Sequence, residues 1–278
     1  MEAVNLEQRI HDAMHLMTAA EKRAARGLLA NYPMLGFAPV AEFAQGSDAS
    51  PATVLRFVSR IGFKSYPEFQ KALRDELEER TKSPLQRSAS APPRDSDHFL
   101  DRFFDRTIVN MVGTAERVPA SEFEAACQRL AALRHGCHFA GGRFTDAMAM
   151  YMEAHLRLVR PGVRRLDGRI ANRADQLLDV KPGDTAVLFD VRRYDADLLD
   201  TAEQLAARRA VTILVTDEWL SPISRYAKIV LPTRIGMDRT WDANTALFSL
   251  VEALIARTTE LSWPAAAKRI GENDQTLS

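Results

Sequence analysis

Residues 49–69 read ASPATVLRFVSRIGFKSYPEF, and this stretch decides how the first part of the chain folds. Ser50 followed by Pro51 is a typical helix start, because a serine oxygen accepts from the free amides of the first turn and proline fits that turn. Apolar residues then recur at helical spacing as far as Ile61, and Gly62 suits the left-handed residue that often ends a helix. The stretch therefore predicts a short amphipathic helix that begins at Ser50 and ends at Ile61.

The two faces of this expected helix differ in chemistry. One face is apolar and should pack in a core, whereas the other carries polar and basic side chains. From Ser50 to Ser65 there are three basic residues and no Asp or Glu. A short helical segment and a turn that contains Gly46 precede the helix, an order typical of a helix-turn-helix, whose second helix lies in the major groove of DNA. The alternative is a small helical bundle with a solvated basic face.

The residues expected to contact DNA follow from their positions on this helix. Ser50 and Thr53 lie near its N-terminus, where side chains and amides meet base edges or phosphates. Arg56 is placed to bind a guanine edge or a phosphate, and Arg60 and Lys64 are placed to bind phosphates.

The composition divides the chain into two domains joined by a linker. Residues 81–97 read TKSPLQRSASAPPRDSD, which is rich in Ser and Pro and poor in large apolar residues, as linkers are. Residues 1–80 show helical periodicity throughout, whereas residues 98–278 contain short apolar runs that alternate with helical segments. This alternation predicts a doubly wound parallel sheet, so the expected fold class is an all-α domain followed by an α/β domain. The expected strands are Cys137–Ala140, Arg165–Asp167, Thr185–Val191, Val211–Thr216 and Ile229–Leu231.

The motif in residues 49–69 resembles the helix-turn-helix of RpiR-type transcriptional regulators. Those proteins carry S-x-A-T-V-x-R-F, then G-F, then a Y-x-E-F step into the next helix, and the three parts correspond here to Ser50–Phe57, Gly62–Phe63 and Tyr66–Phe69. The resemblance implies that residues 98–278 form a SIS (sugar isomerase) domain that senses a small anionic effector, such as a sugar phosphate. It also implies a homodimer or homotetramer on a palindromic or repeated double-stranded DNA operator, and a regulator rather than an enzyme.

Two loops of the expected SIS domain depart from the family pattern. The loop after the first strand usually reads G-x-G-x-S, and residues 141–145 read GGRFT, so the hydroxyl comes one residue late. A later loop usually reads S-x-S-G-x-T, whereas residues 189–197 read FDVRRYDAD, with adjacent arginines and no Ser, Thr or Gly. Because guanidinium groups can hold an anion by forked hydrogen bonds, we expect an anionic ligand here. The expected ligand-binding residues are Gly141, Gly142, Arg143, Thr145, Arg192 and Arg193.

Other interpretations of the second domain stay open at this point. Arg192 and Arg193 can instead form structural ion pairs with neighbouring acids, namely Asp190, Asp195 and Asp197. The domain can also be a vestigial sensor that only dimerises. An isomerase is a third alternative, but it needs an acid–base pair and the hydroxyl-rich loop that residues 189–197 lack.

The remaining features of the sequence limit the function classes. Hydrophobic residues make up 46% and charged residues 27%, a globular composition, and Lys plus Arg equals Asp plus Glu at 37 each. Any DNA contact must therefore come from local charge. Cys127 and Cys137 form no C-x-x-C pair and fit a reducing cytosol. No signal peptide, membrane span, metal-ligand pattern or nucleophile–base arrangement is recognised, so we expect a cytoplasmic protein without a cofactor.

A long helix is expected over residues 242–261, and it presents a wide apolar stripe. The stripe predicts self-association of the second domain, because paired half-sites in an operator favour an oligomer. The alternative is that this helix covers the sheet, as core helices do. The stripe consists of Leu247, Leu250, Val251, Leu254 and Ile255.

Overall fold

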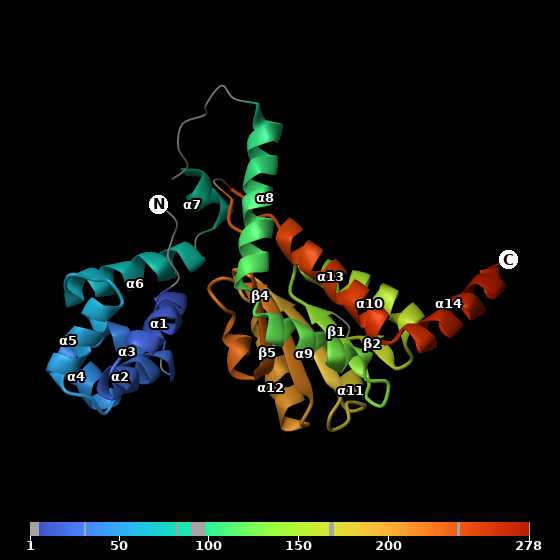
Figure 1. Cartoon of the computed structure of the whole chain (residues 1–278), viewed down its shortest axis with the longest axis horizontal. Coiled ribbons are helices and arrows are strands. Elements are labelled where there is room, and N and C mark those ends of the chain that lie inside the picture. The colour runs from blue at the N-terminus through green and yellow to red at the C-terminus, as the bar shows by residue number, and fades with distance from the viewer. Residues whose placement is uncertain are drawn as a thin grey trace. The chain divides into compact units, whose positions relative to one another are not determined.

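The computed structural model describes residues 6–30, 32–81, 83–89, 98–166, 170–237 and 240–277. The chain divides into two compact units, Met1–Ser83 and Pro84–Ser278, and Figure 1 draws both. Within the described ranges, no helix has both the length and the apolar character needed to cross a membrane.

The first unit is entirely helical. Its core gathers Phe43 of the helix before the turn, Val54, Phe57 and Val58 of the helix after it, and Phe69 of the last helix. All five side chains are buried because they lie on the apolar faces of amphipathic helices. The elements are α1 (Leu6–Ala13), η1 (Met14–Leu16), α2 (Ala19–Ala30), α3 (Met34–Phe37), α4 (Val40–Gly46), α5 (Pro51–Arg60) and α6 (Tyr66–Thr81).

The second unit is an α/β domain with a five-stranded sheet, in which helices cover both faces (Figure 1). Its helices are α7 (Pro84–Ala89), α8 (Phe99–Arg117), α9 (Ala120–Ala131), α10 (Asp146–Val159), α11 (Ile170–Leu177), α12 (Ala196–Ala207), η2 (Pro222–Arg225), α13 (Thr245–Leu261) and α14 (Trp263–Leu277). Its strands are β1 (Cys137–Gly141), β2 (Val163–Arg165), β3 (Thr185–Asp190), β4 (Val211–Asp217) and β5 (Ala227–Thr233).

All strand pairs are parallel, in the order β2-β1-β3-β4-β5. Alternate residues of each strand point to opposite faces, so Val187 and Phe189 of β3 join one core with α9, α10 and α13. Ala186 and Leu188 join a second core with α11 and α12. Burial on both faces explains why the strand reads as a continuous apolar run. The structure thus confirms the predicted doubly wound parallel sheet.

The strand order reverses between β1 and β3, because the chain leaves β1 toward β2 and then returns to the other side. In doubly wound sheets, ligands bind in the crevice outside the carboxyl ends of the strands at such a switch point. Here Gly141 at the end of β1 pairs with Phe189 near the end of β3. The loops that follow these two strands therefore meet at one edge of the sheet.

The structure differs from the expected linker over residues 81–97. Helix α6 continues to Thr81, and Pro84–Ala89 forms α7, which belongs to the second unit. Buried Arg87 of α7 donates to Oδ1 of Asp242 at 2.7 Å and to the carbonyl of Met237 at 2.7 Å, which explains why this polar segment is ordered against the α/β domain. Residues 90–97 lie outside the described part of the chain.

The apolar stripe of α13 is buried within its own domain. Its five residues join the core against α9, α10 and the sheet, so this helix covers the sheet and the alternative interpretation is correct. The exposed apolar face lies instead on α8. It consists of Leu100, Phe104, Ile108, Met111 and Val112, which recur at helical spacing.

Candidate DNA interface and effector pocket

Helix α5, the candidate recognition helix, is built as the sequence predicted. Ser50 caps α5 by accepting from the Thr53 amide at 3.2 Å, and Gly62 beyond its end has a positive φ of 90°. The Phe63 amide folds back to the Val58 carbonyl at 3.2 Å, which closes the C-terminus. Four of the residues expected to contact DNA are exposed in the structure, namely Ser50, Arg56, Arg60 and Lys64.

Thr53 differs from the other predicted DNA contacts because its side chain is only 4% exposed. Its hydroxyl lies 2.8 Å from the Ser50 hydroxyl and accepts from Nη2 of Arg56 at 3.2 Å. The structure therefore gives Thr53 the role of orienting Ser50 and Arg56. A direct base contact by Thr53 needs these bonds to rearrange.

Arg60 faces a carboxylate of its own unit. Its Nη2 lies 3.8 Å from Oε1 of Glu21, whose side chain is buried on α2. The Thr18 amide donates to Glu21, and this bond, with Arg60 and Arg56 nearby, lowers the pKa of Glu21. The positive charge of Arg60 is thus partly compensated by Glu21, whereas no acid forms an ion pair with Arg56 among the described residues.

Two further basic residues, Arg23 and Arg26 on α2, are exposed and were missed by the sequence reasoning. Nε of Arg23 donates to the carbonyl of Asp48 at 3.0 Å, in the turn before α5, where Asp48 has a φ of 50°. Helix α2 packs directly against α5. The KRAAR run at 22–26, with basic residues at i, i+1 and i+4, was the available signal.

The second candidate site is a pocket of about 120 Å³ at the switch point. The loop after β1 and the loop after β3 line it together, as the topology requires. Position 141, where the first loop begins, requires glycine. A Cβ atom on any other residue would clash, because it would lie 2.4 Å from the Asp146 amide nitrogen. The lining residues are 142–145, 190–193 and Asp195.

Thr145 and Gly142 are engaged with the protein itself. The Thr145 hydroxyl accepts from the Gly142 amide at 2.9 Å and donates to the Phe189 carbonyl at 2.5 Å, and its side chain is buried. The amides that open α12, those of Asp197 and Leu198, donate to the Asp195 carboxylate. These three amides at the edge of the sheet therefore already have acceptors within the protein.

The adjacent arginines Arg192 and Arg193 have opposite orientations. The Arg192 side chain is 4% exposed, lies over the Trp219 ring at 3.8 Å and has its Nε 3.6 Å from Oδ2 of Asp242. Arg193 is exposed, with a φ of 68°. Within the described ranges, no ion pair joins either arginine to Asp190, Asp195 or Asp197. Arg143 is also exposed at the pocket and stacks on the Phe144 ring at 5.2 Å.

Buried carboxyls lie beside these arginines. Burial raises the pKa of Asp190 to about 7, although the Ser221 hydroxyl donates to it at 2.5 Å and the Asp195 amide at 3.2 Å. Burial also raises the pKa of Asp217, which accepts from the Tyr194 hydroxyl and from the Arg192 amide. The floor of the pocket thus holds a carboxyl that titrates near neutrality, while its rim carries two guanidinium groups.

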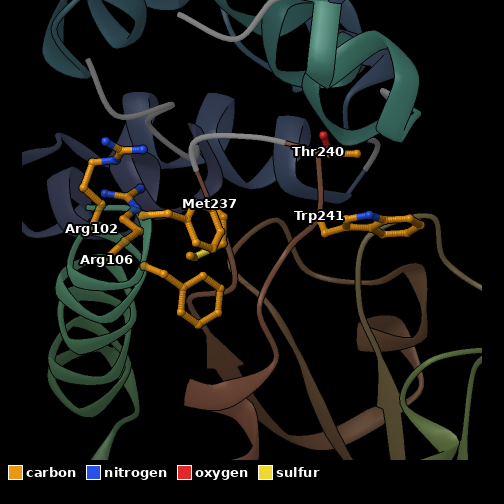
Figure 2. A pocket seen from close by; sticks show the side chains of 7 residues that line it. Arg102, Arg106, Met237, Thr240 and Trp241 are labelled. Carbon is orange, nitrogen blue, oxygen red and sulfur yellow. The ribbon is translucent and has the colours of Figure 1, made fainter. Parts of the chain in front are cut away.

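A larger pocket of about 300 Å³ lies between α8 and the residues before α13. Figure 2 shows Arg102 and Arg106 of α8 on one side of it and Trp241 on the other, with Met237 between them. Two phenylalanines, Phe99 and Phe103, complete its apolar lining. The Trp241 ring contacts the Phe144 ring edge to face, with centroids 6.1 Å apart, so this aromatic pair joins the two pockets.

Sequence comparison agrees with both parts of this architecture. Residues 4–80 match the helix-turn-helix domain of the rpiR family, and residues 137–257 match the SIS domain. The protein is therefore a helix-turn-helix DNA-binding protein with a C-terminal SIS domain. With both matches in this order over more than two thirds of its length, the chain belongs to the RpiR-type transcriptional regulators. No protein of curated function matches the chain.

Solved structures support the same fold. The sugar isomerase domain of an RpiR transcription factor from Sphaerobacter thermophilus is 22% identical, with a TM-score of 0.57 over 64% of this chain and 99% of that one. The Vibrio vulnificus NanR protein, complexed with ManNAc-6P, is 17% identical, with a TM-score of 0.55 over 98% of each chain. A phosphoheptose isomerase from Francisella tularensis is 16% identical, with a TM-score of 0.50 over 59% of this chain and 100% of that one. At these identities the likeness concerns the fold alone.

Proposed function

We propose that this protein is a transcriptional regulator that binds operator DNA through α5 and changes its DNA binding when a small anion occupies the pocket at the switch point. The observation that carries the proposal is the exposed face of α5, a helix that contains no Asp or Glu and on which Arg56 is held in place by Thr53. In a helix-turn-helix this face enters the major groove. Arg23 and Arg26 of α2 add positive charge for the phosphate backbone.

The anion is proposed to bind Arg143 and Arg193. Both side chains are exposed at the pocket, and neither has an ion pair among the described residues. The NanR relative was solved with a sugar phosphate, which favours a metabolite ligand for the SIS domain. An isomerase activity is disfavoured, because the loop 190–195 contains no Ser or Thr and the hydroxyl of its Tyr194 donates to Asp217.

We also propose that the protein is a homo-oligomer in the cytoplasm, joined by the exposed apolar face of α8 rather than by α13. Five large apolar side chains on one helix form the kind of patch that marks an interface. Two copies on paired half-sites would raise the operator affinity through effective concentration.

The DNA half of the proposal is tested with Arg56→Ala and Arg60→Ala in the full chain. Arg56→Ala should weaken operator binding by about 1–3 kcal/mol, or about 5- to 150-fold, and should relax the base preference at one position. Arg60→Ala should weaken binding evenly across sequences and reduce the salt slope by about 1.

Arg74→Ala is the matched control, since Arg74 is an exposed arginine on α6. Gel shifts over a series of salt concentrations measure all three variants. If the first two variants bind as the control does, α5 is not the recognition helix.

A second candidate is a constitutive regulator whose sensor no longer binds a ligand. It is favoured by Thr145 and Asp195, which accept from three amides at the edge where a phosphate would bind. Gel shifts with and without candidate anions separate the two functions, because only the sensing regulator changes its operator affinity.

A further inference from the structure

The small pocket at the switch point is poorly built for a phosphate dianion. The Gly142 amide already donates to Thr145, the two amides that open α12 already donate to Asp195, and the carboxyls of Asp190 and Asp195 line the pocket. A doubly charged group would be repelled by the Asp195 carboxylate, and also by Asp190 once the pH exceeds its raised pKa of about 7. What the pocket offers a ligand is the pair of guanidinium groups at its rim, those of Arg143 and Arg193.

The size of the pocket also argues against a complete ligand inside it. About 120 Å³ is below the range of roughly 300–1,000 Å³ that is usual for small-molecule sites, whereas the adjoining pocket reaches about 300 Å³. An anionic group therefore fits the first pocket and the body of the ligand fits the second. Four apolar side chains line the second pocket, beside Thr240 and the arginines Arg102 and Arg106, so the body that packs against those four is mainly apolar. The four are Phe99, Phe103, Met237 and Trp241.

Two exposed aromatic rings stand where the pockets meet. Phe144 is 56% exposed and Trp241 is 62% exposed, although the rings contact each other edge to face. Arg143 stacks on Phe144, so an anion at Arg143 lies beside an aromatic surface. Large aromatic side chains left exposed beside a pocket are typical of a surface that packs against a ring.

We propose, building on the sensing function above, that the effector is an organic monoanion with an aromatic body. Its oxyanion binds Arg143 and Arg193, and its ring packs against Phe144 and Trp241. This ligand class differs from a sugar phosphate in charge and in polarity, and the floor carboxyls of the pocket tolerate one negative charge more readily than two.

Calorimetry and thermal shift of the full chain test this class with four probes: indole-3-acetate, its neutral amide, phenylpyruvate and glucose 6-phosphate. The two aromatic acids should bind and raise the melting temperature. The amide and the sugar phosphate should bind at least about tenfold more weakly, equal to about 1.4 kcal/mol.

Arg193→Ala and Trp241→Ala should each weaken binding of the aromatic acids about tenfold or more. Trp263→Ala is the matched control, because Trp263 is 56% exposed at the start of α14 and lines neither pocket. Stronger binding of glucose 6-phosphate, unchanged binding by Trp241→Ala, or no binding of either acid would overturn the ligand class. If glucose 6-phosphate alone changes operator affinity, the sensing function stands and only the ligand class fails. If no probe changes it while α5 still binds the operator, the sensing function fails as well.

A second inference rests on a different residue, Asp242. Its two carboxylate oxygens face two arginines: Oδ1 lies 2.7 Å from Nη1 of Arg87, and Oδ2 lies 3.6 Å from Nε of Arg192. Arg192 belongs to the loop that lines the effector pocket, and Arg87 belongs to α7. Helix α7 begins at Pro84, directly after the residue at which the DNA-binding unit ends.

We infer that Asp242 couples the effector loop to α7, and thus to the segment that leads into the DNA-binding unit. The inference uses the proposed effector site. A ligand that moves the 190–193 loop changes the distance from Arg192 to Asp242, and the same carboxylate then holds Arg87 differently. The side chain of Arg192, packed on Trp219, transmits such a movement because it is buried.

Amide hydrogen exchange of the full chain tests the coupling without a ligand or DNA. Asp242→Asn should raise exchange several-fold in both 84–89 and 191–195, because it weakens both ion pairs. Asp179→Asn, at an exposed aspartate paired with exposed Arg164, is the control and should change neither segment. Arg87→Ala removes the other partner of the Arg87–Asp242 ion pair. This variant tests the coupling if Asp242→Asn does not fold. If amide exchange rises in only one of the two segments, the coupling is wrong. This outcome does not depend on whether the DNA-binding proposal is correct.

Discussion

Asp190 at the floor of the pocket makes the stability of the protein depend on pH in a predictable way. Burial raises the pKa of Asp190 from 3.8 to about 7. The carboxyl of Asp190 therefore binds its proton more tightly in the folded chain than in the unfolded chain. The stabilisation from the bound proton is complete below about pH 4 and is lost as the pH rises through about 7. At about 1.4 kcal/mol for each pH unit, the ionised carboxyl costs on the order of 4 kcal/mol at pH 8.

Asp190→Asn removes this ionisation and keeps a similar shape. Asparagine still accepts from the Ser221 hydroxyl, but it loses the bond from the Asp195 amide, which is worth about 1 kcal/mol. The net gain at pH 8 is therefore on the order of 3 kcal/mol, or roughly 6–12 °C in melting temperature for a domain of this size. At pH 5 the gain should fall below about 1 kcal/mol.

Thermal melts of wild type, Asp190→Asn and the surface control Asp179→Asn at pH 5 and pH 8 provide the measurement. Asp179 is exposed, so its variant should follow wild type at both values. Equal gains for Asp190→Asn at the two pH values, or no gain at pH 8, would refute the assignment of a buried neutral carboxyl at the pocket floor.

Two other expected outcomes concern the fold and the assembly. Thr145→Val removes the hydroxyl that accepts from the Gly142 amide and donates to the Phe189 carbonyl, while the direct bond from that amide to that carbonyl at 3.1 Å remains. We therefore expect a loss of about 1 kcal/mol in thermal melts, and an unchanged melting temperature would show that the bridge is unimportant. Phe104→Glu on α8 should shift the protein toward monomer in sedimentation. The control Leu178→Glu, at an exposed leucine outside α8, should leave the oligomeric state unchanged. If Phe104→Glu also leaves the oligomeric state unchanged, the interface lies elsewhere.

The parts of the fold that the sequence predicts are those in which local signals and packing agree. In α5, the Ser50 cap, the apolar spacing and the Gly62 stop all favour the same helix, and the structure forms it. The strand alternation likewise predicts the sheet, because strands buried on both faces must read as apolar runs.

The rest depends on distant partners. Helix α7 lies in a stretch with the composition of a linker, and Arg87 is ordered by Asp242, 155 residues away. The burial of Thr53 depends on how α5 packs, which helical phase alone does not fix. The direction of the apolar stripe on α13 also depends on packing. The sequence allows this stripe to face either a partner or the sheet, and the structure packs α13 against α9 and α10.

Arg192 and Arg193 are adjacent in the sequence, but the structure gives their side chains different surroundings. Two adjacent arginines at the end of a strand look equivalent, yet Arg192 turns inward to Trp219 and Asp242 and stabilises the loop. Arg193 adopts a left-handed φ of 68°, a conformation that costs a non-glycine residue roughly 1–2 kcal/mol. It gains no ion pair with the described acids in return. The contacts among the described residues therefore give no reason for an arginine at this position, and the proposed anion at the rim of the pocket would give one.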